Sequence, residues 1–186
     1  MSQATPYERL DAWVDAHFDE EVKFLQALVQ VPTDTPPGNN APHAQRTAAL
    51  LQGFGFEAEH HPVPAAEVKG YGLESLTNLI VRRKYAPDGS GPTIALNAHG
   101  DVVPPGDGWT HAPYGAEIAD GKLYGRAAAV SKSDFATYSF AVRALESLQA
   151  PLKGGVELHF TYDEEFGGEM GPGFLLRNKL TRPDLL

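Results

Sequence analysis

The sequence predicts an α/β fold, with a sheet packed between helices. Segments with helical spacing of apolar residues alternate with short apolar runs that suit strands. The clearest strand is Thr93–Asp101, TIALNAHGD, where a continuous apolar run is followed at once by polar residues. A second run, Val156–Tyr162, alternates apolar side chains and also leads into polar residues. A continuous apolar run bounded by turn signals predicts a strand buried on both faces, and Thr93–Asp101 begins with such a run.

Each remaining element is predicted from a local signal. A capping box starts the first helix, with Thr5 as N-cap, Pro6 in the first turn and Glu8 closing the box. Apolar residues at helical spacing predict further helices at Asp19–Val29, Ala44–Gln52, Asp134–Leu148 and Gly173–Asn178. Additional strands are expected at Phe56–His61 and Asn78–Lys84, with a hairpin at Ala116–Tyr124. The stretch from Thr93 to Tyr162 should form a right-handed strand–helix–strand crossover between parallel strands.

The segment Val31–Pro42, VPTDTPPGNNAP, is too rich in proline and glycine for regular structure. One interpretation is a plain linker between helices. The other is a rigid loop that lines a site, since ordered loops often carry functional residues. The sequence leaves both open.

Composition excludes several functional classes. The net charge is −9 and no dense basic patch is present, which argues against nucleic acid as a partner. Without any cysteine, a metal site would have to use His, Asp and Glu. The N-terminus lacks the features of a signal peptide, and no apolar run approaches the ~18 residues of a membrane span. We therefore expect a cytoplasmic protein with no membrane partner.

Polar clusters follow two of the predicted strands. His99 and Asp101 come after the first, and Asp163, Glu164 and Glu165 after the second. The carboxyl ends of parallel strands meet at one sheet edge, where ligands commonly bind. An imidazole with a carboxylate behind it suits a metal ion, and one of two adjacent glutamates can act as general base. Carboxylates that face one another would repel unless a cation lay among them.

Simpler interpretations exist for each motif. A single histidine after a strand can be an ordinary hydrogen-bonded loop residue, and three acidic residues can form a solvated loop. The adjacent pair His60 and His61 is interpreted as an exposed strand end, because neighbouring strand residues point to opposite faces.

The stretch ALNAHGDVVPPGDGWTHAPYGAEIADGKLYGRAAAVSK, followed downstream by TYDEEFGG, resembles a known family. It is similar to the zinc peptidases that include acetylornithine deacetylase, succinyl-diaminopimelate desuccinylase, aminoacylase and glutamate carboxypeptidase. The resemblance runs in order from about Asp19 to the end. It implies a three-layer α/β/α sandwich of the zinc-peptidase (phosphorylase/hydrolase-like) type.

The resemblance also implies roles for four residues. His99 and Glu165 would be metal ligands, Asp101 would orient His99, and Glu164 would be the general base. The ion would be Zn²⁺, although Co²⁺ or Mn²⁺ suits the same ligands. The implied reaction is hydrolysis of an amide bond in N-acyl amino acids or small peptides by metal-activated water. The family resemblance also allows a homodimer of the full-length parent.

The chain departs from the family pattern at one ligand. The family has Gly-Arg-Gly-x-x-Asp-x-Lys, with an Asp that bridges two metals, but here Val130 stands at that position. An isopropyl group cannot bind a metal. Asp134 lies four residues further on, one helical turn away, and is the residue that could substitute; its alternative role is a helix N-terminal residue favoured by the macrodipole.

Relatives are also roughly twice as long as this chain. We therefore expect residues 1–186 to be the N-terminal part of a catalytic domain, without the lid or dimerisation domain and the C-terminal part. Such an incomplete domain is expected to be inactive alone. The alternative is a non-catalytic relative that keeps the fold as a binding or interaction module, an interpretation that Val130 favours.

Overall fold

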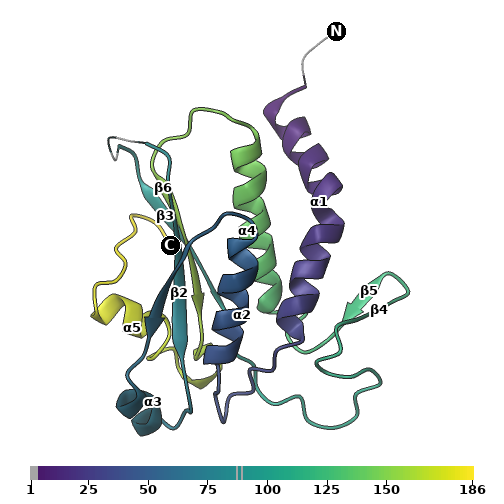
Figure 1. The fold of residues 1–186 in the computed structure, drawn as a ribbon, viewed down its shortest axis with the longest axis vertical. Coiled ribbons are helices and arrows are strands. Elements are labelled where there is room, and N and C mark those ends of the chain that lie inside the picture. The colour runs from purple at the N-terminus through teal and green to yellow at the C-terminus, as the bar shows by residue number, and fades with distance from the viewer. Residues whose placement is uncertain (1–3, 87, 89) are drawn as a thin grey trace.

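The computed structural model describes residues 4–86, 88 and 90–186, and its main sheet has four strands in the order β1-β2-β6-β3 (Figure 1). The strands are β1 (Ala58–Pro62), β2 (Thr77–Lys84), β3 (Thr93–His99) and β6 (Gly155–Thr161). A separate hairpin is formed by β4 (Glu117–Ala119) and β5 (Lys122–Tyr124), and Figure 1 shows it projecting beside the end of α1. The helices are α1 (Pro6–Val29), α2 (Ala41–Gln52), α3 (Ala65–Tyr71), α4 (Lys132–Ser147), the 3₁₀ turn η1 (Glu164–Phe166) and α5 (Pro172–Arg177).

The sheet is mixed, and its parallel pair positions the candidate site. Strands β1 and β2 are antiparallel, as are β2 and β6, whereas β3 and β6 run parallel. In the register of that pair His99 lies opposite Thr161, so the polar residues after both strands emerge at one edge. The predicted strand–helix–strand connection between parallel strands, β3–α4–β6, is thereby confirmed.

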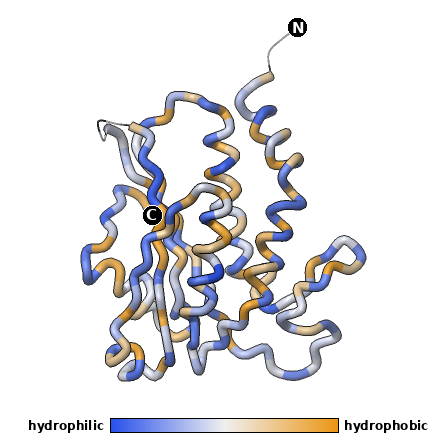
Figure 2. The backbone as a smooth tube through the Cα atoms, in the orientation of Figure 1, coloured by the Kyte–Doolittle hydropathy of each residue, from blue (hydrophilic) through white to orange (hydrophobic). Residues whose placement is uncertain are grey.

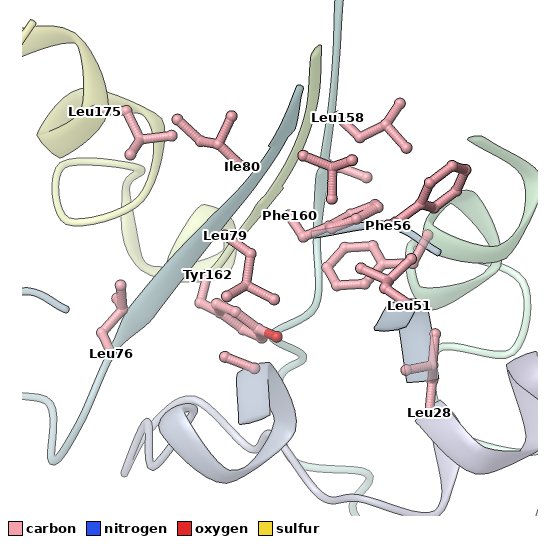
Figure 3. Packing of buried hydrophobic residues seen from close by; sticks show 14 of the residues in the cluster. Leu28, Leu51, Phe56, Leu76, Leu79, Ile80, Leu158, Phe160, Tyr162 and Leu175 are labelled. Atoms are coloured by element: carbon pink, nitrogen blue, oxygen red, sulfur yellow. The ribbon is translucent and has the colours of Figure 1, made fainter. Parts of the chain in front are cut away.

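Helices cover both faces of the sheet. Figure 1 shows α1, α2 and α4 on one side and α5 on the other. Figure 3 shows Leu175 of α5 beside Ile80 of β2, while Leu79 lies on the opposite side with Phe160 and Tyr162. This period-two alternation is what a strand covered on both faces requires. The predicted α/β/α layering is confirmed.

The core is made of aliphatic and aromatic side chains at the spacing that the sequence suggests. Along α1, hydrophobic and hydrophilic residues alternate in bands (Figure 2). From α4, the Phe135 ring packs 4.5 Å from the Phe160 ring of β6, measured between centroids. Phe135, Phe160 and Tyr162 are completely buried.

The helices differ from the prediction in two places. The N-terminal region forms one helix of 24 residues rather than two, and Phe18 within it is 58% exposed. Nothing between Phe18 and Glu20 breaks a helix, and adding residues to an existing helix is cheaper than starting another. Helix α3 was missed because its seven residues carry too few apolar positions for a periodic signal.

Strand β3 also differs from the prediction. We expected it to be buried on both faces, but it is the outer strand of the sheet among the described residues, and Ile94 is 41% exposed. Within the described part of the chain, its outer side is paired only near its start, where the Ala95 N–H donates to the Leu185 carbonyl at 2.8 Å. Among the described residues, no helix combines the length and apolar character that a membrane span needs.

Candidate metal centre

His99, the last residue of β3, is held by its neighbour Asp101. Its Nδ1 lies 3.1 Å from the Asp101 carbonyl oxygen and 3.4 Å from Asp101 Oδ1. Both atoms are acceptors, so Nδ1 carries the proton and Nε2 keeps its lone pair. A histidine prepared in this way presents Nε2 as a metal ligand.

The two glutamates after β6 reach the same point. Ligand atoms of His99, Glu164 and Glu165 all lie within 4.8 Å of one another. His99 Nε2 lies 3.8 Å from Glu164 Oε2. Both glutamates are exposed and His99 is half-buried, so the cluster opens to solvent.

Asp101 joins the two halves of the cluster. Its carboxylate is completely buried and accepts the N–H groups of Glu164 at 3.3 Å and Glu165 at 3.0 Å. Burial alone would raise the pKa of Asp101, but the His99 hydrogen bond and the backbone N–H groups outweigh it and hold that pKa below its usual value. Burial likewise opposes protonation of His99, and the adjacent Asp101 nevertheless raises the His99 pKa.

The three donors fit a divalent metal ion. One imidazole nitrogen and two carboxylates form a borderline donor set of the kind used for catalytic zinc. A tetrahedral ion would hold its ligand atoms about 3.4 Å apart, so only a small contraction of the 4.8 Å cluster is needed. The exposed glutamates can make that adjustment by side-chain rotation.

Other residues considered from the sequence lie outside this cluster. Asp163 is buried with its Oδ2 accepting the Met170 N–H, and burial raises the pKa of Asp163 to about 6. It therefore does not face the two glutamates, contrary to the expectation of three facing carboxylates. Asp134 accepts a hydrogen bond from Ser131 at the start of α4, and Val130 is 68% exposed. His60 is exposed on β1, as expected, whereas His61 is half-buried and lies 3.2 Å from Glu59.

Comparison with known proteins gives this geometry a context. The sequence profile of Peptidase family M20/M25/M40 matches residues 95–185, which include all four predicted site residues. The chain is 42% identical over 154 residues to a succinyl-diaminopimelate desuccinylase of Gluconobacter oxydans, which covers 82% of this chain.

This chain belongs to the M20/M25/M40 peptidase family. It is also 35% identical over 148 residues, 78% of the chain, to the succinyl-diaminopimelate desuccinylase of Rhodospirillum centenum. The chain spans about a third of the length of these curated relatives, 36% in both cases. Among solved structures, the M20 metallo-carboxypeptidase Sso-CP2 of Sulfolobus solfataricus superposes with a TM-score of 0.72 at 20% identity, covering 89% of this chain and 36% of its own. That likeness supports the fold.

Two features of this M20 chain were missed or left open by the sequence. The first is the loop Val31–Pro42, which lies against the end of β3 rather than acting as a linker. The Thr33 hydroxyl donates to the Gly100 carbonyl at 2.6 Å, and Val102 N–H donates to the Thr33 carbonyl at 3.1 Å. The Thr35 N–H returns a 2.7 Å bond to the Val102 carbonyl. The loop thus braces the segment that carries His99.

The second feature is Lys132, which is completely buried although it is a lysine. Its Nζ donates to the Val31 carbonyl at 2.7 Å, and within the described ranges it forms no salt bridge. Burial lowers the pKa of Lys132 to about 7, against the opposing charges of Asp34 and Asp101. The sequence signal was its place in the family motif, which carries no information about burial.

Proposed function

We propose that this protein is a metal-dependent hydrolase that cleaves an amide bond in N-acyl amino acids or small peptides. The observation that carries the proposal is the convergence of His99, Glu164 and Glu165, whose ligand atoms lie within 4.8 Å. Asp101 is buried behind them with its carboxylate 3.4 Å from His99 Nδ1, and a metal-binding histidine usually has such a carboxylate beside its other ring nitrogen. Membership of a peptidase family supports the same class of reaction.

In this proposal His99 and Glu165 hold the metal ion. When bound, the ion would supply a Lewis acid that activates water and polarises the acyl carbonyl. Asp101 keeps the proton on His99 Nδ1, so that Nε2 faces the ion. Glu164 takes the proton from the attacking water and passes it to the leaving amine.

Variants must decide which glutamate is the metal ligand and which is the general base, because Glu164 itself has an oxygen 3.8 Å from His99 Nε2. Zn²⁺ is the proposed ion, and Co²⁺ or Mn²⁺ would suit the same donors. N-succinyl amino acids are the first substrates to test, because two relatives at 35–42% identity are desuccinylases. A homodimer and a cytoplasmic location remain predictions.

We further propose that residues 1–186 alone turn over substrate poorly. A catalytic zinc commonly has three protein ligands and one water, and only two residues of this cluster are assigned as ligands once Glu164 acts as base. Val130, at the place where the family has its bridging Asp, adds none. The alternative function, a non-catalytic binding module, is also supported by Val130.

Calorimetric titration with Zn²⁺ tests the site. The unmodified chain should bind zinc, His99→Ala and Glu165→Gln should each lose at least tenfold in affinity, and Glu164→Gln should lose less than threefold. The matched control is His111→Ala, because His111 lies 2.9 Å from Glu117 in an exposed His–Glu pair on the hairpin. Equal zinc affinity in His99→Ala and the control would refute the site.

Turnover then separates the two candidate functions. Amine release from N-succinyl and N-acetyl amino acids should be detected for the protein at the length of its curated relatives. Zinc binding without any amine release from these substrates or from dipeptides would favour the binding module.

A further inference from the structure

A second layer of buried polar residues lies beneath the two glutamates. Asp163, directly before Glu164, is completely buried and adopts a left-handed backbone with φ 104°. Its carbonyl oxygen accepts the N–H groups of Phe166 at 3.3 Å and Gly168 at 2.7 Å. This conformation turns the chain sharply from β6 into η1 and thereby starts the glutamate loop, which we define as residues 163–170.

The Asp163 side chain closes the same loop from the other end. Its Oδ2 accepts the Met170 N–H at 2.7 Å, seven residues further along the chain. From β2, the buried side chain of Asn78 donates to the Met170 carbonyl at 2.9 Å and accepts the Tyr162 N–H at 3.4 Å. Asp163 and Asn78 therefore tie the two ends of the glutamate loop to each other and to the sheet.

These contacts affect the position of the candidate metal ligands. The N–H groups of Glu164 and Glu165 donate to the Asp101 carboxylate, which also lies 3.4 Å from His99 Nδ1. Those N–H groups point at Asp101 only while the chain leaves Asp163 in its left-handed turn. The path of the glutamate loop thus determines where both carboxylates stand relative to His99.

We propose that Asp163 and Asn78 form a buried clamp that positions Glu164 and Glu165 against His99. The proposal deepens the proposed metal centre and rests on it. Asp163 is a positioning residue here, since its carboxylate is bound to the Met170 N–H and lies outside the metal cluster. Removing a group that holds a metal ligand in place typically weakens metal binding by 10–100-fold.

Two substitutions separate the role of the Asp163 backbone conformation from the role of its carboxylate. Asp163→Gly tolerates the left-handed conformation but removes the acceptor for Met170. Asp163→Asn tolerates the same conformation and keeps an oxygen acceptor, while removing the charge. Neither variant forces a strained backbone, so each can keep the fold while it changes only the clamp.

The experiment combines hydrogen exchange of the glutamate loop with calorimetric titration by Zn²⁺ alone. In Asp163→Gly, the amides of Glu165 and Met170 should exchange at least tenfold faster than in the unmodified chain, and zinc should bind at least tenfold more weakly. Asp163→Asn should rescue both properties to within threefold. Asn78→Leu, which removes the other half of the clamp, should behave like Asp163→Gly.

Asp88→Gly is the matched control, because Asp88 also accepts a backbone N–H, that of Ser90, but in an exposed turn. It should leave loop exchange and zinc affinity unchanged. The proposal is overturned if Asp163→Gly retains slow exchange at Glu165, or if Asp163→Asn loses as much zinc affinity as Asp163→Gly.

Hydrogen exchange tests the clamp independently of whether the metal centre binds zinc. If the unmodified chain binds no zinc, the proposed function fails, and exchange at the Glu165 amide alone then decides whether the clamp orders the loop. If zinc binds normally but Asp163→Gly changes neither measurement, the clamp fails and the metal centre stands.

Discussion

Lys132 offers the sharpest test of the energetics around the site. Its ammonium group is buried at the start of α4, where it donates to the Val31 carbonyl and approaches the Tyr114 ring at 5.9 Å. Burial of a charge without a close counter-ion is costly, and the pKa of Lys132 is lowered to about 7 as a result. The perturbation is Lys132→Met, which keeps an unbranched side chain and removes the titrating group.

The sign and size of the change in unfolding free energy with pH follow from proton binding to the folded and unfolded states. In the unfolded chain a lysine has a pKa of about 10.4, so between pH 7 and that value the unfolded state binds more protons than the folded state. The free energy of unfolding should therefore rise with pH through this window. The stabilisation that is present above the window is lost as pH falls to about 7. At ~1.4 kcal/mol per pH unit, the rise from pH 7.5 to 9.5 is about 3 kcal/mol.

Urea unfolding at pH 7.5, 8.5 and 9.5 measures this rise. With a slope of ~2 kcal/mol per molar, the midpoint should move upward by about 1–1.5 M across the window. The window lies above the ordinary titration range of histidine and below that of the tyrosines, whose shifted members, such as Tyr85 and Tyr114, have raised pKa values.

In Lys132→Met the midpoint should be nearly independent of pH over the same range. Loss of the bond to Val31 lowers stability equally at each pH, so the slope is the readout. The exposed Lys153→Met is the control and should keep the slope of the unmodified chain. A flat or falling midpoint in the unmodified chain, or an unchanged slope in Lys132→Met, would refute a neutral Lys132 in the folded state.

The other predictions concern the cap, the site and the sheet edge. Thr5→Ala breaks the capping box with Glu8 and should cost ~0.5–2 kcal/mol in urea unfolding; no loss at all would show that the cap is frayed in solution. Glu164→Gln should keep zinc content and lower turnover ~10²–10⁴-fold, and unchanged turnover would exclude it as the base. Val130→Asp should raise zinc stoichiometry, measured by mass spectrometry of bound metal. Because Ile94 on the outer strand is 41% exposed, the isolated chain should self-associate in analytical ultracentrifugation, and Ile94→Lys should reduce it; a monomeric unmodified chain would contradict this.

Signals confined to a few neighbouring residues were sufficient for much of the fold. The Thr5–Glu8 capping box and the hairpin turn at Asp120-Gly121 were predicted correctly, because each depends on contacts within four residues. The crossover from β3 to β6 followed from the length of the intervening helix and the known handedness of such units. His99 and Glu165 were predicted as ligands from a family motif at the ends of two strands, and the structure brings their ligand atoms together with those of Glu164.

Long-range packing decided what those signals could not. Whether the strand at Thr93 was buried on both faces depended on neighbours distant in the sequence. The loop at Thr33 could have been a linker until its bonds to Gly100 and Val102 were seen.

The buried polar residues are the strongest example of this division. Asp163 and Glu164 are adjacent acidic residues with the same local preferences. The Asp163 carboxylate is nevertheless buried and accepts the Met170 N–H, whereas the Glu164 side chain is exposed to solvent. Asn78, which contacts Met170 and Tyr162 at the two ends of the glutamate loop, lies 84 residues before Tyr162 in the sequence. The sequence by itself determined which chemical groups are present and in what order. Only the tertiary structure decided which of them are desolvated, because desolvation depends on atoms contributed by distant parts of the chain.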